Sequence, residues 1–427
     1  MSPSFRTVLR LFLLLQIVVQ ASAQTAPALR EPDWSGIAGY PAPPVISARS
    51  AILVDVDART ILYARDPDLV VPPASLTKVV AIDAALRAVQ LGEVDADVLF
   101  EPPFESWAEN QAPGSSLMFL GPGQRLSLDD LLLGLAVPSG NDAAVALASL
   151  LDGSVEAFVD RMNARIAELG LVDPYFVEPS GLSPLNSITV RSFARFLIAH
   201  IEQFPQSLEQ YYGVRTYTYP EPRHLTISGN RSPITQANRN LLLWDFDGVD
   251  GFKTGYIEAS GYNLAATAER DGRRLIAIVL GIEAESHLVG GMVRASEAAT
   301  LLEYGFERFS RLRFGYPDAE PVRVYRGQQP WVVPHGQREL VVAVPAGSES
   351  RIAGTSTRRD AVVAPIGPVE VGRVSILLDG IELAAQPLVV PRQETGGLWR
   401  RLWDSVLLVF RRVGDALLRR PGPMRAP

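Results

Sequence analysis

Strand-like and helix-like hydrophobic patterns alternate along the chain before residue 318. Two apolar runs, 51–56 and 61–64, flank the polar turn 57–60, which is the pattern of a β-hairpin. Apolar residues then recur at three- and four-residue steps over 79–86, so a helix is expected there.

More helices are expected in the middle of the chain, and strands return after it. Helical spacing is found over 126–135, 142–151, 158–169 and 190–201. Two strand-like runs, 261–268 and 274–280, are joined by a hairpin signal, Arg270-Asp-Gly-Arg, and a helical segment follows at 292–309. The pattern predicts an α+β fold in which helices are inserted within, and packed on, one antiparallel sheet.

The pattern of hydrophobic and polar residues changes at about residue 318. Short β-rich runs alternate with turns as far as residue 391, and Asp379-Gly380 is a tight-turn pair. This predicts a small all-β domain at 318–391. This segment has no group of residues suited to acid–base catalysis, so a spacer role and a binding role both stay open.

Residues 396–420 form an amphipathic pattern. Apolar and arginine residues fall on different faces of a helix: Leu398, Trp399, Leu402, Trp403, Val406, Leu407, Phe410 and Val413 against Arg400, Arg401, Arg411 and Arg412. This profile is typical of a helix that lies on a membrane surface, and a terminal helix packed on its own protein is the alternative. The arginines interrupt the apolar run, so a spanning helix is not expected.

The N-terminus has the pattern of a signal peptide at 1–23. Arg6 and Arg10 precede or open an apolar stretch, and Ala21-Ser-Ala23 is a small-residue cleavage site. Residues 24–45, rich in Pro, Ala and Gly, are expected to be a linker, which leaves 46–312 as the α+β domain. We therefore expect an exported protein on the periplasmic or extracytoplasmic face of the cell membrane, held peripherally by its tail.

The amino-acid composition limits the kinds of catalytic and metal site that the chain can form. At 427 residues, two domains with short appendages are the natural expectation. The absence of cysteine excludes a thiol nucleophile, a disulfide framework and thiolate metal sites. The four histidines have no metal or triad spacing, so surface or structural roles are expected for them and a Ser-His-Asp hydrolase is disfavoured.

Charge is unevenly distributed. The whole chain has a formal net charge of −7, yet residues 392–427 carry eight arginines against three acidic residues. An acidic body with a basic tail favours an electrostatic contact made by the tail alone. Nothing in the pattern suggests nucleic acid.

The chain has only two lysines among its 40 basic residues, and both lie in motifs that carry chemistry. Ser75 and Lys78 occupy positions i and i+3 where the 79–86 helix begins, and such positions share a face. A serine becomes a nucleophile when a base takes its proton, and a lysine can be that base if burial lowers its pKa. The spacing alone also suits an ordinary helix cap. Two further motifs, Ser139-Gly-Asn141 and Lys253-Thr-Gly255, complete a known catalytic set in the right order.

Together these motifs make the chain resemble the low-molecular-mass penicillin-binding proteins, the serine-type D-alanyl-D-alanine carboxypeptidases of the peptidase S11-like family. The resemblance runs from about Ile46 to the end of the tail. It also includes the strings Pro72-Pro-Ala-Ser75-Leu-Thr-Lys78, Ser139-Gly-Asn-Asp-Ala143, Asp250-Gly-Phe-Lys-Thr-Gly255, Arg270-Asp-Gly272 and Leu402-Trp-Asp-Ser405. It implies a penicillin-binding/β-lactamase-like transpeptidase domain that removes the terminal D-alanine from peptidoglycan pentapeptide stems, with β-lactams as covalent inhibitors and with no cofactor or metal.

The resemblance also implies catalytic roles. Ser75 would attack the carbonyl between two D-alanines, and Lys78 would accept its proton. Ser139 would relay a proton to the leaving D-alanine. Asn141 would orient Lys78 and the substrate amide. Water would then release the acyl group.

The third motif implies substrate binding. Lys253 and Thr254 would hold the terminal carboxylate, and Gly255 would let the substrate lie along the strand edge as an added strand. Backbone N–H groups of Ser75 and Tyr256 would form the oxyanion hole. Many relatives carry histidine where this chain has Tyr256. That role uses only backbone, so the mechanism is expected to survive, with pH dependence and deacylation rate open.

Three other functions share parts of this pattern. A class A β-lactamase would add Glu-x-x-x-Asn between the second and third motifs, and no such string occurs between Asn141 and Lys253. An endopeptidase that cuts peptide cross-links would use the same motifs and stays open. A non-enzymatic wall-binding protein is disfavoured because all three motifs are intact.

Overall fold

The computed structural model describes residues 25–226, 232–315, 320–336 and 339–418, with backbone only for 412–418. These residues form two compact units: a first unit (25–31 and 42–308) and a second unit (32–41 and 309–418). The expected signal peptide at 1–23 lies outside the described residues, as do the last two residues of the expected 396–420 helix.

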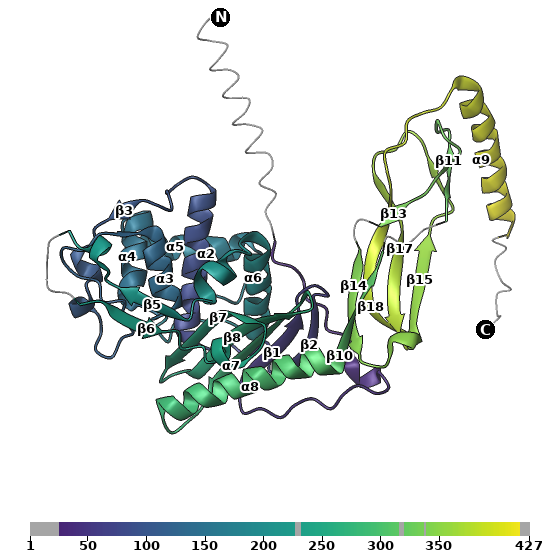
Figure 1. Ribbon diagram of the computed structural model, residues 1–427. Coiled ribbons are helices and arrows are strands. Elements are labelled where there is room, and N and C mark those ends of the chain that lie inside the picture. Colours follow the sequence, from purple (N-terminus) through teal and green to yellow (C-terminus); the bar gives the residue numbers. More distant parts are fainter. Residues whose placement is uncertain (1–24, 227–231, 316–319, 337–338, 419–427) are drawn as a thin grey trace, which may run out of the picture. The chain divides into compact units, whose positions relative to one another are not determined.

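An antiparallel sheet of five strands, ordered β2-β1-β9-β8-β7, organises the first unit (Figure 1). The two expected hairpins are β1–β2 and β8–β9. The second of them turns at Asp271-Gly272, where both residues have the positive φ that a type I′ hairpin turn requires. The strands are β1 Ser50–Asp55, β2 Thr60–Arg65, β7 Val249–Ile257, β8 Gly261–Arg270 and β9 Arg273–Ile282.

Helices pack on both faces of this sheet, and β1 sends alternate side chains to each. Val54 belongs to the main hydrophobic cluster, on the side where α6 (Val190–Gln203) contacts β1 and β9. Leu53 points to α8 (His287–Arg308), and a Cβ added at Gly305 of that helix would lie 3.0 Å from it. Because both faces are buried, β1 is apolar along most of its length rather than alternating.

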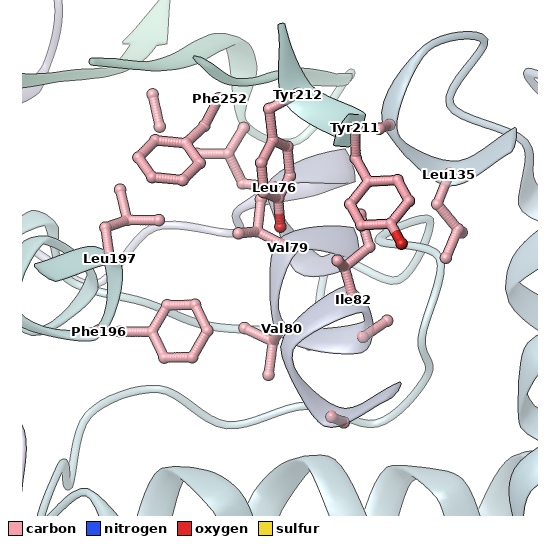
Figure 2. Packing of buried hydrophobic residues seen from close by; sticks show 14 of the residues in the cluster. Leu76, Val79, Val80, Ile82, Leu135, Phe196, Leu197, Tyr211, Tyr212 and Phe252 are labelled. Carbon is pink, nitrogen blue, oxygen red and sulfur yellow. The ribbon is translucent and has the colours of Figure 1, made fainter. Parts of the chain in front are cut away.

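Helix α2 (Thr77–Gln90) is the centre of the helical body. It follows a single 3-10 turn, η2 (Ala74–Leu76), and every residue from its start through Leu86 is buried. Figure 2 shows side chains at its beginning packed among residues of α3 (Leu128–Ala136), α6, η5 (Leu208–Tyr212) and β7. This packing fixes the start of α2, which carries the first motif, against the sheet.

Capping side chains set the starts of neighbouring helices. Ser127 and Asp130 form a capping box at α3, and Thr189 caps α6. The remaining elements of the unit are α3 Leu128–Ala136, α4 Asn141–Asp152, α5 Val155–Glu168, α7 Leu242–Asp245, the ribbons β3 Leu99–Phe100 with β4 Leu126–Ser127 and β5 Thr216–Tyr219 with β6 Ile234–Ala237, and the turns η3 Phe104–Ser106, η4 Ala108–Asn110, η5 Leu208–Tyr212 and η6 Pro222–His224.

The second unit is rich in strands, with sheets ordered β13-β18-β17-β15, β12-β11-β16 and β10-β14. Its strands are β10 Phe309–Phe314, β11 Val322–Tyr325, β12 Trp331–Val332, β13 His335–Gly336, β14 Leu340–Pro345, β15 Ile352–Arg358, β16 Ala361–Val363, β17 Val369–Leu378 and β18 Ile381–Val390, with a short turn η7 Glu349–Arg351. The two units together match the expected α+β class.

Within the segment 24–45, which was expected to be a linker, residues 25–45 are described, and they make specific contacts with both units. Ala26 N donates to Leu169 O (2.8 Å) in the first unit. Residues 32–41 belong to the second unit, where Trp34 in the turn η1 (Trp34–Gly36) is buried, stacks on Tyr40 and meets Phe309 edge-on. The aromatic side chains explain this difference, because burying them outweighs the flexibility that Pro and Gly suggest.

Helix α9 (Leu398–Leu418) lies against β11 in the second unit. Its Asp404 is buried, and the carboxylate accepts a hydrogen bond from Arg326 N (2.6 Å). Trp399, Trp403 and Phe410 are largely exposed, at 84%, 64% and 70%. None of the helices within the described ranges is both long enough and apolar enough to cross a bilayer.

Candidate active site

The first motif is held in an unusual backbone conformation. Ala74, immediately before Ser75, has φ +51°, a left-handed value that is unfavourable for alanine. The turn is fixed by side chains from other elements: Asn263 Nδ2 donates to Pro72 O (3.2 Å) and Pro73 O (3.3 Å). The neighbouring backbone approaches so closely that a Cβ added at Gly181 would lie 1.9 Å from Ala74 O. The surrounding fold therefore imposes the position of Ser75.

Lys78 lies one turn further on, fully buried, with three hydrogen-bond partners. Its Nζ is 3.1 Å from Ser75 Oγ and 2.8 Å from Asn141 Oδ1, and it also donates to Ser180 O. Burial lowers the pKa of Lys78 to about 7, although Glu178 and Asp142 oppose that shift; the charge of Arg239 adds to it. At neutral pH a large fraction of this amine is therefore uncharged.

The second motif lies in the turn between α3 and α4, as its sequence context predicted. Ser139 has φ +65°, and a Cβ at Gly140 would lie 2.9 Å from Met118 N. The next residue, Asp142, accepts from Met118 N (2.8 Å) and Leu120 N (3.0 Å). Burial raises its pKa despite these hydrogen bonds. Asp142 thus ties the loop before Gly121 to the start of α4, which carries Asn141.

The third motif lies on β7, at the edge of the sheet. Burial lowers the pKa of Lys253 well below its ordinary value, and repulsion from Lys78, Arg239 and Arg294 adds to the shift. Lys253 Nζ makes one long hydrogen bond among the described residues, to Thr254 O at 3.4 Å. A bound carboxylate would supply the counter-charge that this lysine lacks.

Gly255 is required for close packing. A Cβ there would lie 2.8 Å from Pro73 O and 3.1 Å from the Ala74 Cβ. The Gly255 carbonyl accepts a hydrogen bond from Arg294 Nη1 of α8 (3.1 Å). Gly255 therefore joins the third motif to the first by direct contact.

A loop that the sequence reasoning did not single out completes the surroundings of Lys78. The Glu178 carboxylate accepts from Ser180 N (2.8 Å) and Gly181 N (2.6 Å), and Asn186 Nδ2 bonds both Glu178 (3.0 Å) and Thr77 Oγ1 (3.2 Å). These hydrogen bonds hold the loop so that Ser180 O accepts a hydrogen bond from Lys78 Nζ. The string Glu178-Pro-Ser-Gly-Leu-Ser has the composition of a loop. From the sequence, a loop could be predicted here, but not its contact with Lys78.

The three motifs meet in a cavity of about 580 Å³. Ser75, Ser139, Asn141, Thr254, Gly255 and Tyr256 line it, and Lys78 and Lys253 are buried behind its wall. The lining also includes residues that no motif identified: Arg239, Tyr262, His287 and Arg294. His287 is exposed, as expected of a surface histidine, and it lines the cavity because the fold brings the start of α8 to the end of β7.

The cavity suits an anionic ligand rather than a metal ion. Arg239 and Arg294 place positive charge around it, and Lys253 is positioned to gain its charge beside a bound anion. Within the described ranges, no three His, Asp or Glu side chains gather in a way that could hold a metal. The arrangement offers a nucleophile, an adjacent base and a positive subsite, which are the parts that acyl transfer from a carboxylate-bearing substrate requires.

Known proteins are similar to this chain in sequence and in fold. The family described as D-alanyl-D-alanine carboxypeptidase (Peptidase_S11) matches residues 38–284. The chain is 32% identical to D-alanyl-D-alanine carboxypeptidase DacC of Escherichia coli K12 over 376 residues, covering 86% of this chain and 89% of that protein. It is 33% identical to DacA of Haemophilus influenzae over 380 residues, covering 86% and 91%.

Solved structures agree with these relatives. Penicillin-binding protein 5 from Haemophilus influenzae superposes with a TM-score of 0.74 at 30% identity, covering 83% of this chain and 99% of that one. Penicillin-binding protein 6B from Escherichia coli gives a TM-score of 0.64 at 32% identity, covering 83% and 99%. With three motifs gathered in one cavity and this similarity along most of its length, the chain belongs to the D-alanyl-D-alanine carboxypeptidase family, peptidase S11.

Proposed function

We propose that the protein is a serine-type D-alanyl-D-alanine carboxypeptidase whose acyl-ester nucleophile is Ser75 and whose general base is Lys78. The observation that carries this proposal is the 3.1 Å contact between Lys78 Nζ and Ser75 Oγ, made by an amine whose pKa is lowered to about 7. A base near the operating pH is the most effective one for taking a proton in the transition state.

The partners of Lys78 direct its lone pair. Asn141 Oδ1 and Ser180 O can only accept hydrogen bonds, so a neutral Lys78 donates its two hydrogens to them. Its lone pair is then left for the third neighbour, the Ser75 hydroxyl. This pattern supports proton transfer from Ser75 to Lys78 as the first step.

Acylation then proceeds by addition and collapse. Ser75 Oγ bonds to the carbonyl carbon between the two D-alanines while its proton passes to Lys78, and the backbone N–H groups of Ser75 and Tyr256 stabilise the oxyanion. The C–N bond breaks as the intermediate collapses. The proton reaches the leaving amine from Lys78 through the Ser139 hydroxyl, which restores the neutral amine.

Substrate binding uses the third motif. Lys253 and the Thr254 hydroxyl hold the terminal carboxylate, whose negative charge the buried Lys253 needs. The absence of a side chain at Gly255 leaves the edge of β7 open to an extended peptide. Asn141 orients the substrate amide as well as Lys78.

Deacylation reuses the same base. Lys78 takes a proton from water, the hydroxyl attacks the ester carbonyl, and the proton returns to Ser75 Oγ as the ester bond breaks. The products are free D-alanine and a stem peptide one residue shorter. A β-lactam presents a similar amide next to a carboxylate, so it acylates Ser75 in the same way. The resulting acyl-enzyme is hydrolysed more slowly.

We also propose that the protein is exported and held at the membrane surface by α9. The exposed aromatic face of that helix, with arginines around it, suits an interface with anionic lipid. The burial of Asp404 against the second unit supports a helix that is docked on one side and free on the other.

Two linked assays test the catalytic proposal. Incubation with penicillin should add the mass of the antibiotic to the protein, and peptide mapping should locate the adduct at Ser75. An acyl-D-Ala-D-Ala peptide should release D-alanine, and Ser75→Ala should lose both reactions. An adduct on another residue, or D-alanine release by the Ser75→Ala variant, would refute the proposal.

A further inference from the structure

Three rings from separate elements form one side of the cavity. The ring of Tyr256 on β7 packs against the ring of Tyr262 on β8 in a tilted arrangement, with 4.4 Å between centroids. His287, the first residue of α8, meets Tyr256 edge-on at 4.7 Å. All three line the cavity. We call this group the aromatic wall.

Helix α8 holds the aromatic wall in place. The Tyr262 hydroxyl and His287 Nδ1 are hydrogen-bonded at 3.0 Å. The next turn of the helix packs directly on the Tyr262 ring, since a Cβ added at Gly290 would lie 2.3 Å from it. Arg294, one turn later, bonds the Gly255 carbonyl. The wall is therefore fixed by a rigid element and not by a loop.

The aromatic wall lies next to the place proposed for the leaving residue. Side chains two positions apart on a strand share a face, so Tyr256 lies beside Thr254 within the cavity. In the proposed binding mode, Thr254 and Lys253 hold the carboxylate of the leaving residue, and its amine faces Ser75. The third substituent on its α-carbon, the side chain, then has Tyr256 and His287 as neighbours.

We infer that the aromatic wall limits the size of the leaving residue's side chain and that His287 is the residue that sets this limit. This inference rests on the proposed function and deepens it. A terminal D-alanine carries only a methyl group there. The leaving residue of a cross-linked stem carries a long side chain that continues into a second peptide. The wall thus favours removal of a terminal D-alanine over cleavage of cross-links.

The test compares leaving residues of increasing size. Substrates are acyl-D-Ala-D-Ala, acyl-D-Ala-D-norvaline and a cross-linked stem dimer, and the measured quantity is the ratio of kcat/KM between D-alanine and each larger leaving group. The wild-type protein should favour D-alanine by at least about tenfold, because even one methylene changes selectivity by that order. His287→Ala should lower the ratio by about tenfold.

Two further variants sharpen the result. His287→Gln keeps a hydrogen-bond partner for the Tyr262 hydroxyl, so its ratio should stay closer to that of the wild type than the ratio of His287→Ala. Val289→Ala removes an exposed side chain on the same turn of α8 that is not part of the cavity lining, and its ratio should equal the wild-type ratio.

The outcomes separate this inference from the proposed function. Acylation of Ser75 by penicillin in the wild type and in His287→Ala reports an intact catalytic site. With that acylation present, a wild type that cleaves all three substrates equally, or a His287→Ala variant with an unchanged ratio, overturns the inference alone. Failure of the wild type to be acylated, or to release D-alanine, would instead overturn the proposed function.

Discussion

At the residue scale, Lys78 and Lys253 differ in their surroundings. Lys78 has three oxygen partners, two of which can only accept, and this arrangement favours a neutral amine that works as a base. Lys253 faces repulsion from Lys78, Arg239 and Arg294 and has little to balance it. Such a group is suited to gain its charge with the substrate carboxylate, because a bound anion raises the pKa of a neighbouring lysine.

The backbone around Ser75 gives a prediction at this scale. Gly181→Ala should slow acylation of Ser75 by about 10²-fold, since its Cβ would overlap Ala74 O and displace the nucleophile. Acylation by a fluorescent penicillin measures this directly.

Gly92→Ala is the matched control. Gly92 also has a positive φ, +72°, but an added Cβ would meet nothing within 4 Å. Gly92→Ala should destabilise the fold by more than about 0.4–1 kcal/mol through backbone strain and leave the acylation rate unchanged. Equal acylation rates in Gly181→Ala and the wild type would show that the close approach to Ala74 does not position the nucleophile.

At the element scale, α2 carries the site at one end and a buried ionic group in its interior. Asp83 bonds Arg165 Nε (2.7 Å) and His200 Nδ1 (2.8 Å), and all three side chains are buried. Burial alone would raise the pKa of Asp83, but the hydrogen bonds and charges of His200 and Arg165 outweigh it, so the pKa lies below its ordinary value. The network links α2 to α5 and α6, further along α2 than Ser75 and Lys78.

Asp83→Asn should destabilise the fold by about 3–5 kcal/mol at pH 7, because it removes the buried counter-charge of Arg165 and leaves only the longer pair with Glu168, at 3.5 Å. The sign of the pH dependence follows from the lowered pKa: the ionised Asp83 stabilises the fold above its unfolded pKa of about 3.9, and that contribution disappears as the pH falls through the lower folded value. Urea unfolding at about pH 7 and about pH 3 measures it.

The difference between wild type and Asp83→Asn should therefore shrink at the lower pH. Asp97→Asn, an exposed position, should change stability by less than about 0.5 kcal/mol at either pH. A difference for Asp83→Asn that is the same at both values would mean that the charge of Asp83 is not what stabilises this network.

Local pattern predicted most elements of the first unit, and distant contacts explain what it left out. Both hairpins, the helix after Ser75 and the turn at Ser139-Gly-Asn141 follow from hydrophobic period and turn residues. Arg239, His287 and Arg294 in the cavity wall, and Ser180 beside Lys78, carry no motif spacing. They reach the site only because the fold brings together segments far apart in sequence. Ser180, for example, is 102 residues from Lys78. No periodicity records such a contact.

At the scale of the whole molecule, catalysis and membrane attachment are assigned to different parts of the chain. All the residues proposed for catalysis lie in the first unit, and α9 belongs to the second. Its exposed Trp399, Trp403 and Phe410 carry the proposed contact with lipid. The two functions should therefore be separable.

Ending the chain at Pro391 should abolish flotation with vesicles of anionic phospholipid, because it removes the aromatic face and the basic residues of the tail. Acylation by penicillin should be retained. High salt should weaken binding of the full chain only in part, since salt screens the contacts of the arginines with lipid charges and does not screen the burial of apolar area. Equal flotation with and without the tail would favour a helix that packs only on its own protein.

The central claim is that Lys78 is the general base for Ser75. It is tested most directly by the rate at which penicillin acylates Ser75, measured as a function of pH in the wild type, Lys78→Arg and Lys253→Arg. Arginine keeps its charge and cannot practically be deprotonated, so the same conservative change should have unequal effects at the two sites.

The wild-type rate should rise with pH and level off above about 7, because the deprotonated form of Lys78 is the reactive one. Lys78→Arg should lose about 10²–10⁴-fold or more, the usual worth of a positioned general base. Lys253→Arg should mainly weaken capture of the antibiotic and keep part of the rate. A wild-type rate that is flat through pH 7, or a Lys78→Arg variant that acylates as fast as Lys253→Arg, would contradict the assignment.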